Sequence, residues 1–251
     1  MHSFFEKWSS IFAYDNDIEL LKDKGLFGEY FTVDEFIHSK DFGNTDSKLL
    51  HEGLLPIPYC GNIFSAKLII LTLNPRLQLG DYFAEKDERF LNALRENLNQ
   101  EREDFPFLFL DPSLSFHPGY NWWTRKLGYV LNKFFKFNVE KKYEIQNEIS
   151  KKIANIELIP FHSFGFEEKI MKFINELEYP KDLRLFLEQE ILPKVEAGSC
   201  KLVVNVGPAK WKEFMGDNLT WKRLTKNGRI TIDYKQNENI RADDAGFNII
   251  I

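Results

Sequence analysis

The chain has 251 residues, 43% of them hydrophobic, which is enough for one substantial core and favours a single domain over residues 1–251. The formal net charge of −5 and the two cysteines argue against a wholly basic surface, a disulfide framework and a four-cysteine metal site. No apolar run is long enough to span a membrane, and the N-terminus lacks a signal-peptide pattern. We therefore expect a cytoplasmic protein that contacts no membrane and acts as a monomer.

Residues 1–50 are predicted to form a helical N-terminal cap, with a short helix at about residues 33–40. Apolar residues recur there at helical spacing, namely Phe4, Trp8, Ile11, Phe12, Ile18, Leu20 and Leu21. A loop with two prolines, residues 54–61, then leads into the main part of the chain. The α/β core is expected to cover residues 54–235.

The segment Lys67–Pro75 is apolar on both faces, which is typical of a buried strand in a parallel sheet. The strand must end near Pro75, because proline cannot donate to a sheet ladder and keeps the residue before it extended. Asn74 therefore stands at the carboxyl end of a central strand, where open α/β sheets bind ligands. The alternative is that Asn74 only caps the following turn.

Further strands are predicted at Ile156–Pro160, Lys201–Val206 and Arg229–Tyr234. Between and around them, the apolar spacing predicts helices at about Glu85–Gln100, Trp122–Phe135, Lys141–Ala154, Glu167–Leu177, Lys181–Ala197 and Lys210–Met215. Strands that alternate with helices imply right-handed crossovers. The sequence therefore predicts an α/β protein, a three-layer α/β/α sandwich around a mostly parallel sheet of about four to five strands.

Polar residues follow several of these strands, as Asn74, as His162 with Ser163, and as Asn205. Since the carboxyl ends of parallel strands meet at one edge of a sheet, we expect these side chains to converge. Each also has a purely structural interpretation: His162 could be a buried histidine beside a turn, and Asn205 could bond neighbouring backbone. His117, before Pro118, could simply fix its loop.

The sequence has none of the common cofactor or metal motifs. Its five histidines are scattered, and it contains no H-E-x-x-H, C-x-x-C, G-x-G-x-x-G, P-loop or G-x-S-x-G pattern. We therefore expect no metal and no cofactor, and the common nucleotide-cofactor enzymes, NTPases and α/β-hydrolases are not favoured.

The order of these motifs resembles the uracil-DNA glycosylase superfamily, most closely its mismatch-specific uracil/thymine branch. The resemblance covers about residues 54–235 and rests on Leu73–Arg76, on Phe116–Trp123 opening a helix, and on Val203–Lys210. The chain departs from the family pattern in three places. Arg76 replaces a glycine, a long segment precedes His117, and residues 235–241 stand where the family has its second catalytic motif.

The resemblance implies a metal-independent enzyme that hydrolyses the N-glycosidic bond of a flipped-out base in DNA. Its catalytic residues would be Asn74, which positions the attacking water, and His162, which donates to the leaving base. An amide is a poor base, so slow chemistry is expected, and Asp81 or Asp111 is an alternative base. The base-binding residues would be Phe107, Phe116, His117, Ser163 and Asn205, and the DNA-binding residues Arg76, Gly207, Lys210, Asn239 and Arg241.

The substrate implied is a modified, damaged or mismatched base in single- or double-stranded DNA, in base excision repair or in defence against phage. Two alternatives remain, an inactive module that binds nucleic acid or a nucleotide, and a hydrolase of a small nucleoside or nucleotide. A basic strip through Arg76, Lys210 and Arg241 would favour DNA, whereas a closed pocket with an acidic rim would favour a small molecule.

Overall fold

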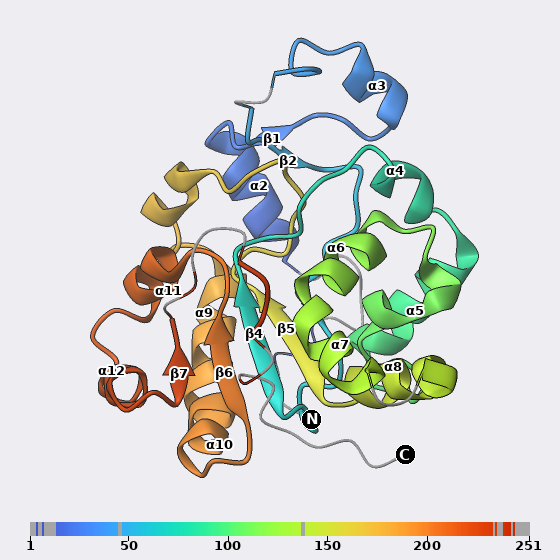
Figure 1. Cartoon of the computed structure of the whole chain (residues 1–251). Coiled ribbons are helices and arrows are strands. Elements are labelled where there is room, and N and C mark those ends of the chain that lie inside the picture. The colour runs from blue at the N-terminus through green and yellow to red at the C-terminus, as the bar shows by residue number, and fades with distance from the viewer. Residues whose placement is uncertain are drawn as a thin grey trace.

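The computed structural model describes residues 4, 7, 14–44, 47–136, 139–232, 234, 238–241 and 243. They form an α/β structure with a five-stranded sheet in the order β3-β5-β4-β6-β7 and a separate pair, β1-β2 (Figure 1). This confirms the α/β class and the mostly parallel sheet. The predicted positions Trp8, Ile11 and Phe12 lie outside the described residues, as do residues 235–237 and residues 244–251.

Strand β4 (Leu68–Thr72) is the centre of the sheet, and all of its residues are buried. It pairs in parallel with β5 (Ile153–Glu157) on one side and with β6 (Lys201–Val204) on the other. Beyond β6 lies β7 (Ile230–Thr231), also parallel, and beyond β5 lies β3 (Tyr59–Cys60), which is antiparallel. Because β4, β5 and β6 run the same way, their carboxyl ends lie at one edge of the sheet.

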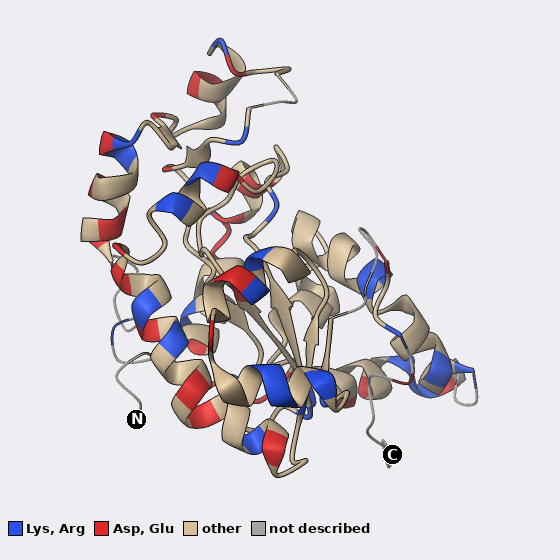
Figure 2. Ribbon diagram, turned by 90° about the vertical axis from the view of Figure 1, so that its left-hand side faces the viewer, with Lys and Arg blue, Asp and Glu red and all other residues tan. Residues whose placement is uncertain are grey.

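Helices lie on both faces of this sheet, which explains why the central strands are apolar on both sides (Figures 1 and 2). One face carries a continuous helical rod made of α9 (Glu178–Phe186), the π-helical turn η5 (Leu187–Ile191) and α10 (Leu192–Glu196). The other α-helices among the described residues are α2 (Asp15–Asp23), α3 (Val33–Ile37), α4 (Asp81–Ala84), α5 (Glu88–Leu98), α6 (Pro118–Lys126), α7 (Gly128–Phe135), α8 (Lys142–Ser150), α11 (Pro208–Met215) and α12 (Leu219–Lys226).

Short elements complete the structure. The first pair of strands consists of β1 (Phe27–Gly28) and β2 (Leu50–His51), which are parallel. Short 3₁₀ segments occur at η1 (Leu108–Leu110), η2 (Pro112–Leu114), η3 (Val139–Lys141) and η4 (Glu168–Lys172). No helix among the described residues combines the length and the hydropathy that crossing a bilayer requires.

Several predicted bounds were wrong. Strand β5 begins at Ile153 rather than Ile156, and the preceding helix ends at Ser150 rather than Ala154. The expected helix over residues 167–177 contains only the 3₁₀ segment η4, which buries the adjacent residues Ile170 and Met171. The expected helix over residues 122–135 begins at Pro118 and is divided between α6 and α7, and α12 and β3 were not predicted.

Gly207 begins α11 in the left-handed conformation, with φ 66°. A Cβ atom at this position would lie 2.5–2.6 Å from side-chain atoms of Leu73, which follows β4. We expect Gly207→Ala to lower the free energy of unfolding by about 2–4 kcal/mol in urea titrations, from strain and clash together. Gly228→Ala is the matched control, because Gly228 has φ 74° but nothing within 4 Å of its Cβ position. Equal losses in both variants would contradict the close packing of Gly207 on Leu73.

Candidate functional site

A cavity of about 700 Å³ lies at the carboxyl ends of β4, β5 and β6. This is the edge of the sheet at which the sequence predicted a site. The polar residues that line it include Lys48, Thr72, Asn74, Arg76, Gln78, Asp81, His117, Asn155, Glu157, His162, Ser163, Asn205 and Tyr234. Its apolar walls include Ile57, Leu73, Phe109, Trp122, Trp123, Phe164, Phe166 and Val206.

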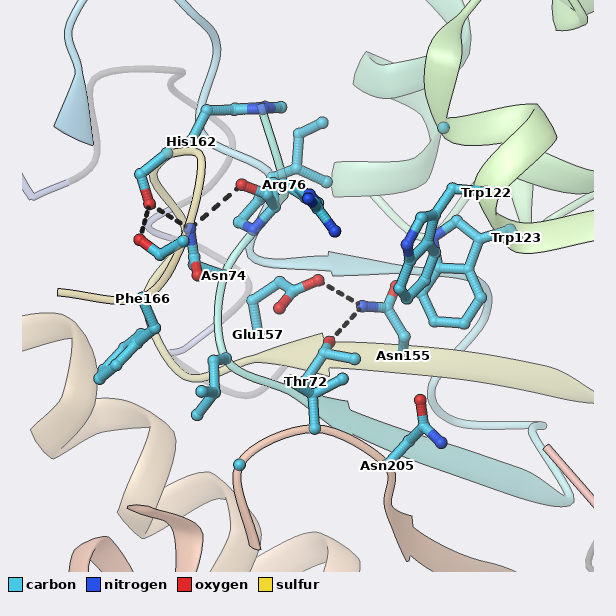
Figure 3. Close-up of a pocket in the computed structure, with 18 of the residues that line it drawn as sticks. Thr72, Asn74, Arg76, Trp122, Trp123, Asn155, Glu157, His162, Phe166 and Asn205 are labelled. Atoms are coloured by element: carbon cyan, nitrogen blue, oxygen red, sulfur yellow. Dashed lines mark hydrogen bonds between the residues drawn. The ribbon is translucent and has the colours of Figure 1, made fainter. Parts of the chain in front are cut away.

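Two strand residues, Asn155 and Glu157, form a hydrogen-bonded pair in the wall of the cavity (Figure 3). Asn155 Nδ2 donates to Glu157 Oε1 at 3.0 Å and to Thr72 Oγ1 at 3.2 Å. The other acceptor on each side chain, Asn155 Oδ1 and Glu157 Oε2, has no hydrogen-bond partner among the described residues. Such buried polar atoms are costly unless a ligand or a water satisfies them.

Burial controls the charge of Glu157. It raises the pKa of this carboxyl to about 8, against an ordinary value of 4.5, and the opposing effects of Thr72, His162 and Asn155 are smaller. At neutral pH the carboxyl therefore carries a proton for most of the time. A protonated carboxyl can donate a hydrogen bond, and it can act as a general acid.

Asn74 is held by its amide nitrogen. Nδ2 donates to Ser163 Oγ at 2.8 Å and to the carbonyl of Pro75 at 3.1 Å (Figure 3). It also donates to the carbonyl of Phe161 at 3.4 Å. Ser163 in turn donates to the carbonyl of Gly165 at 2.7 Å, which fixes the direction of its hydroxyl. None of the hydrogen bonds found among the described residues uses Asn74 Oδ1, which is therefore available to accept one from a ligand or a water.

The main chain explains why Asn74 and Ser163 meet. Beyond their strands, the segments after β4 and β5 continue side by side, and Ile159 N–H donates to the carbonyl of Leu73 at 2.9 Å. A parallel bridge then joins Arg76 to Ser163. The predicted convergence of the polar residues at the strand ends is confirmed, because Asn74, His162, Ser163 and Asn205 all line the cavity.

Two histidines and two carboxylates lie together beside this wall. His162 Nε2 is 3.1 Å from Glu85 Oε1, and His162 Nδ1 is 4.0 Å from Asp81 Oδ2. Burial lowers the pKa of His162, but Glu85 and Asp81 outweigh it, so the pKa is raised above 6.5. For Glu85, burial raises the pKa, and the nearby His162 and His117 more than reverse this effect and lower it to about 2.

Aromatic rings form much of the remaining wall, but not the rings that the sequence singled out. Phe107 does not line the cavity, because it is fully buried and packs edge-on against Trp123 at 4.9 Å. Phe116 does not line it either, because its ring lies under the guanidinium of Arg89 at 4.5 Å. Trp122 and Trp123 line it instead, and their rings are 4.7 Å apart and nearly perpendicular.

The predicted DNA-contacting residues divide into two groups. Arg76 and Gly207 line the cavity, together with Lys48, whereas Lys210, Asn239 and Arg241 do not. Lys210 Nζ lies 3.6 Å from Glu168, and Arg241 Nε lies 3.0 Å from Glu238. The charges of Lys210 and Arg241, two of the three residues of the basic strip that would favour DNA, are therefore partly neutralised, while Lys48 and Arg76 form no ion pair with a described residue.

The remaining predicted residues keep mixed roles. His117 and Asn205 line the cavity, but Asn205 Nδ2 donates to the carbonyl of Glu238 at 3.1 Å. Of the alternative bases, Asp81 lines the cavity, whereas Asp111 does not and pairs with Arg102. The sequence reasoning missed Glu157 and Asn155, although a glutamate inside an otherwise apolar strand is an unusual pattern that could have drawn attention.

Comparison with known proteins adds no relative: no family model, no curated protein and no solved structure matches this chain.

Proposed function

We propose that the chain hydrolyses the N-glycosidic bond of a nucleotide whose base occupies the cavity, as a DNA glycosylase-like enzyme. One observation carries the proposal: Glu157, a buried carboxyl that holds its proton near neutral pH, shares one cavity with the fixed amide of Asn74. A donor for a departing base and an acceptor that orients a water are the two groups that this reaction needs.

The chemistry follows from these two groups. The bond between C1′ and the base nitrogen breaks, its electron pair goes to the base, and the base takes the proton from Glu157. A water held by Asn74 Oδ1 forms the new bond to C1′ and releases its proton to solvent, from which Glu157 recovers one. Trp122, Trp123 and Phe109 supply apolar surface against which an extruded base can stack.

The fold is consistent with this proposal. We infer that the helix-sheet-helix arrangement is of the uracil-DNA glycosylase type, with Asn74 in the position that follows the central strand. Lys48 and Arg76 at the cavity, neither of which has a carboxylate partner among the described residues, favour a substrate that carries phosphate. The left-handed turn at Gly207 opens α11, and the N–H of Ala209 in its first turn could contact a second phosphate, since Pro208 has no N–H and that of Lys210 donates to the Gly207 carbonyl.

A mononucleotide is the second candidate substrate. The pairing of Lys210 with Glu168 and of Arg241 with Glu238 shortens the basic strip that a long nucleic acid would follow. The two cations that remain at the cavity, Lys48 and Arg76, are sufficient for one phosphate group.

A base-release assay tests the proposal. Labelled single- and double-stranded oligonucleotides containing uracil, mismatched thymine, hypoxanthine or glucosylated hydroxymethylcytosine are incubated with the protein and treated with alkali, and the matching mononucleotides are analysed for free base. We expect release by the wild type and at least a tenfold loss in Asn74→Ala, because the attacking water is no longer oriented.

Asn92→Ala is the control for this substitution, since Asn92 is exposed on α5 and lies outside the cavity. Release of base from oligonucleotides alone would select DNA, and release from mononucleotides alone would select the second candidate. No release from either panel, or equal rates in wild type and Asn74→Ala, would overturn the assignment.

A further inference from the structure

Four ionisable side chains form a buried cluster beside the cavity, and the proposed reaction does not require it. Asp81, Glu85, His117 and His162 are 1%, 4%, 2% and 2% exposed. They come from α4 and its C-terminal end, from the start of α6 and from the segment after β5. Asp81, His117 and His162 line the cavity, and Glu85 lies behind them.

The cluster brings two carboxylates together in a buried site. Among the described residues, neither Asp81 nor Glu85 forms an ion pair with a lysine or arginine, and only histidines lie within ion-pair distance. Both carboxylates are buried in a site with almost no access to solvent. A divalent cation would neutralise them completely, which is the usual requirement for buried charges.

Several atoms of the cluster have no hydrogen-bond partner. Glu85 Oε1, His117 Nε2 and both ring nitrogens of His162 are all buried and unsatisfied among the described residues. Although His162 Nε2 is 3.1 Å from Glu85 Oε1, the pair lacks hydrogen-bond geometry. His162 therefore has an ion-pair contact with Glu85 but no hydrogen bond at either ring nitrogen, and a buried ring in this state points to a ligand.

The distances fit an ion. Ligand atoms that surround an ion at about 2.0–2.2 Å lie roughly 3–3.6 Å from one another. His162 Nε2 and Glu85 Oε1 already have this spacing, and ligand atoms of Asp81, Glu85 and His117 all lie within 4.8 Å of one another. Asp81 belongs to the second of these groups, and its Oδ2 lies 4.0 Å from His162 Nδ1 rather than from Nε2, so its side chain would have to change rotamer to reach the same ion.

His117 has a different part in this arrangement. Its Nδ1 accepts the N–H of Gly119 at 2.9 Å, so a neutral ring carries its proton on Nε2. His117 Nε2 is 3.9 Å from Glu85 Oε1 and is suited to donate to that carboxylate or to a water bound to the ion. Outer groups of this kind orient the ligands of metal sites.

We propose that the cluster binds one divalent transition-metal ion, with Glu85 Oε1 and His162 Nε2 as its first two ligands, Asp81 as the third, and His117 as an orienting donor. The imidazole ligand favours Mn²⁺, Fe²⁺, Co²⁺ or Zn²⁺ over Mg²⁺ and Ca²⁺, which prefer oxygen alone. Since His162 and Asp81 line the cavity, the remaining coordination positions would face it. This inference goes beyond the proposed function and does not depend on it.

The test measures metal directly and uses no substrate. The full chain is purified without chelator and its metal content is determined by mass spectrometry; it is then dialysed against EDTA and titrated with Co²⁺, followed by visible absorption. We expect about one ion per chain, and a loss of affinity of at least tenfold in Glu85→Gln and His162→Gln. His51→Gln is the control, because His51 is buried outside the cluster and bonds to the hydroxyl of Tyr82 at 2.7 Å.

A second measurement needs no variant. The melting temperature of the EDTA-treated wild type should rise with Mn²⁺, Co²⁺ or Zn²⁺ and stay unchanged with Mg²⁺ at the same concentration. Substoichiometric metal with no such rise, or equal loss of Co²⁺ affinity in His51→Gln, would overturn the proposal. Either result would mean that the cluster is a buried network of His162 with two carboxylates and holds no metal. This conclusion would not depend on the outcome of the base-release assay.

Discussion

Replacing Glu157 with glutamine is expected to slow base release about 10²–10⁴-fold, the range typical of a lost general acid. Glutamine keeps the shape of the side chain and can still accept from Asn155 Nδ2, but it has no proton to transfer to the departing base. In the wild type, the rate should fall as pH rises through about 8, because only the protonated carboxyl donates. The variant should lack this decline. Single-turnover release measured from pH 5 to about 10 provides both comparisons.

The same substitution has a signature in stability that does not depend on activity. Glu157 titrates near 8 in the folded protein and near 4.5 in the unfolded chain, so the folded state holds an extra proton between these values. The free energy of unfolding contributed by this group is therefore greatest below pH 4.5 and is lost as pH rises through 8, at up to about 1.4 kcal/mol per pH unit.

In Glu157→Gln the stability should depend less on pH across this window, and the variant should be the more stable protein at pH 8. Glu144→Gln, at an exposed position of α8, is the control for both experiments. A rate unchanged by Glu157→Gln would remove this residue from the chemistry, and an unchanged pH slope of stability would show that its carboxyl is ionised in the folded protein.

Asp17→Ala is expected to lower the free energy of unfolding by about 2–5 kcal/mol. Asp17 belongs to α2 but caps a different helix: Oδ1 accepts the N–H of Glu178 at 2.6 Å, and Oδ2 accepts that of Tyr179 at 2.8 Å. The residue before α9, Leu177, has no side-chain oxygen and cannot cap it. Alanine at position 17 would leave both amides without a partner in a site that is only 2% exposed at Asp17.

Urea titrations monitored by circular dichroism measure this loss. Asp15→Ala is the matched control, since Asp15 is an exposed aspartate in the first turn of the same helix. A loss no larger than that of the control would mean that solvent replaces Asp17 at the start of α9. The expected difference would show that α2 stabilises the start of α9. Helix α9 belongs to the helical rod that covers one face of the sheet.

The central strands could be predicted because their environment is uniform. Strands β4 and β6 are buried on both faces, so an apolar run and its polar end mark each of them clearly. Strand β5 was misplaced because Ile145, Ile149 and Ile153 continue the four-residue spacing of a helix across the boundary. Only pairing with β4 turns Ile153 into a strand residue, and this contact is not visible in local periodicity.

The site could be predicted only in part, because many of its features depend on contacts between residues that are far apart in the sequence. The position of Asn74 could be predicted from the sequence, because it depends only on one apolar strand and on the proline that follows it. The charge state of Glu157 depends on burial beneath segments far away in the chain. Trp123 lines the cavity and Phe107 does not, because Phe107 is packed beneath Trp123 in the core, and local sequence does not reveal this packing. The pairing of His162 with Glu85 joins residues from separate elements, and no spacing motif describes it.

The outermost strands of the sheet have a consequence for how the protein behaves in concentrated solution. Strands β3 and β7 contain only two residues each, and β3 lies directly between Pro58 and Gly61. Sheet borders with long rows of free backbone groups recruit strands from other molecules, which leads to aggregation and domain swapping. Edge strands as short as β3 and β7 expose few free backbone groups with which another molecule could pair. The apolar strands at the centre of the sheet are therefore shielded from intermolecular pairing.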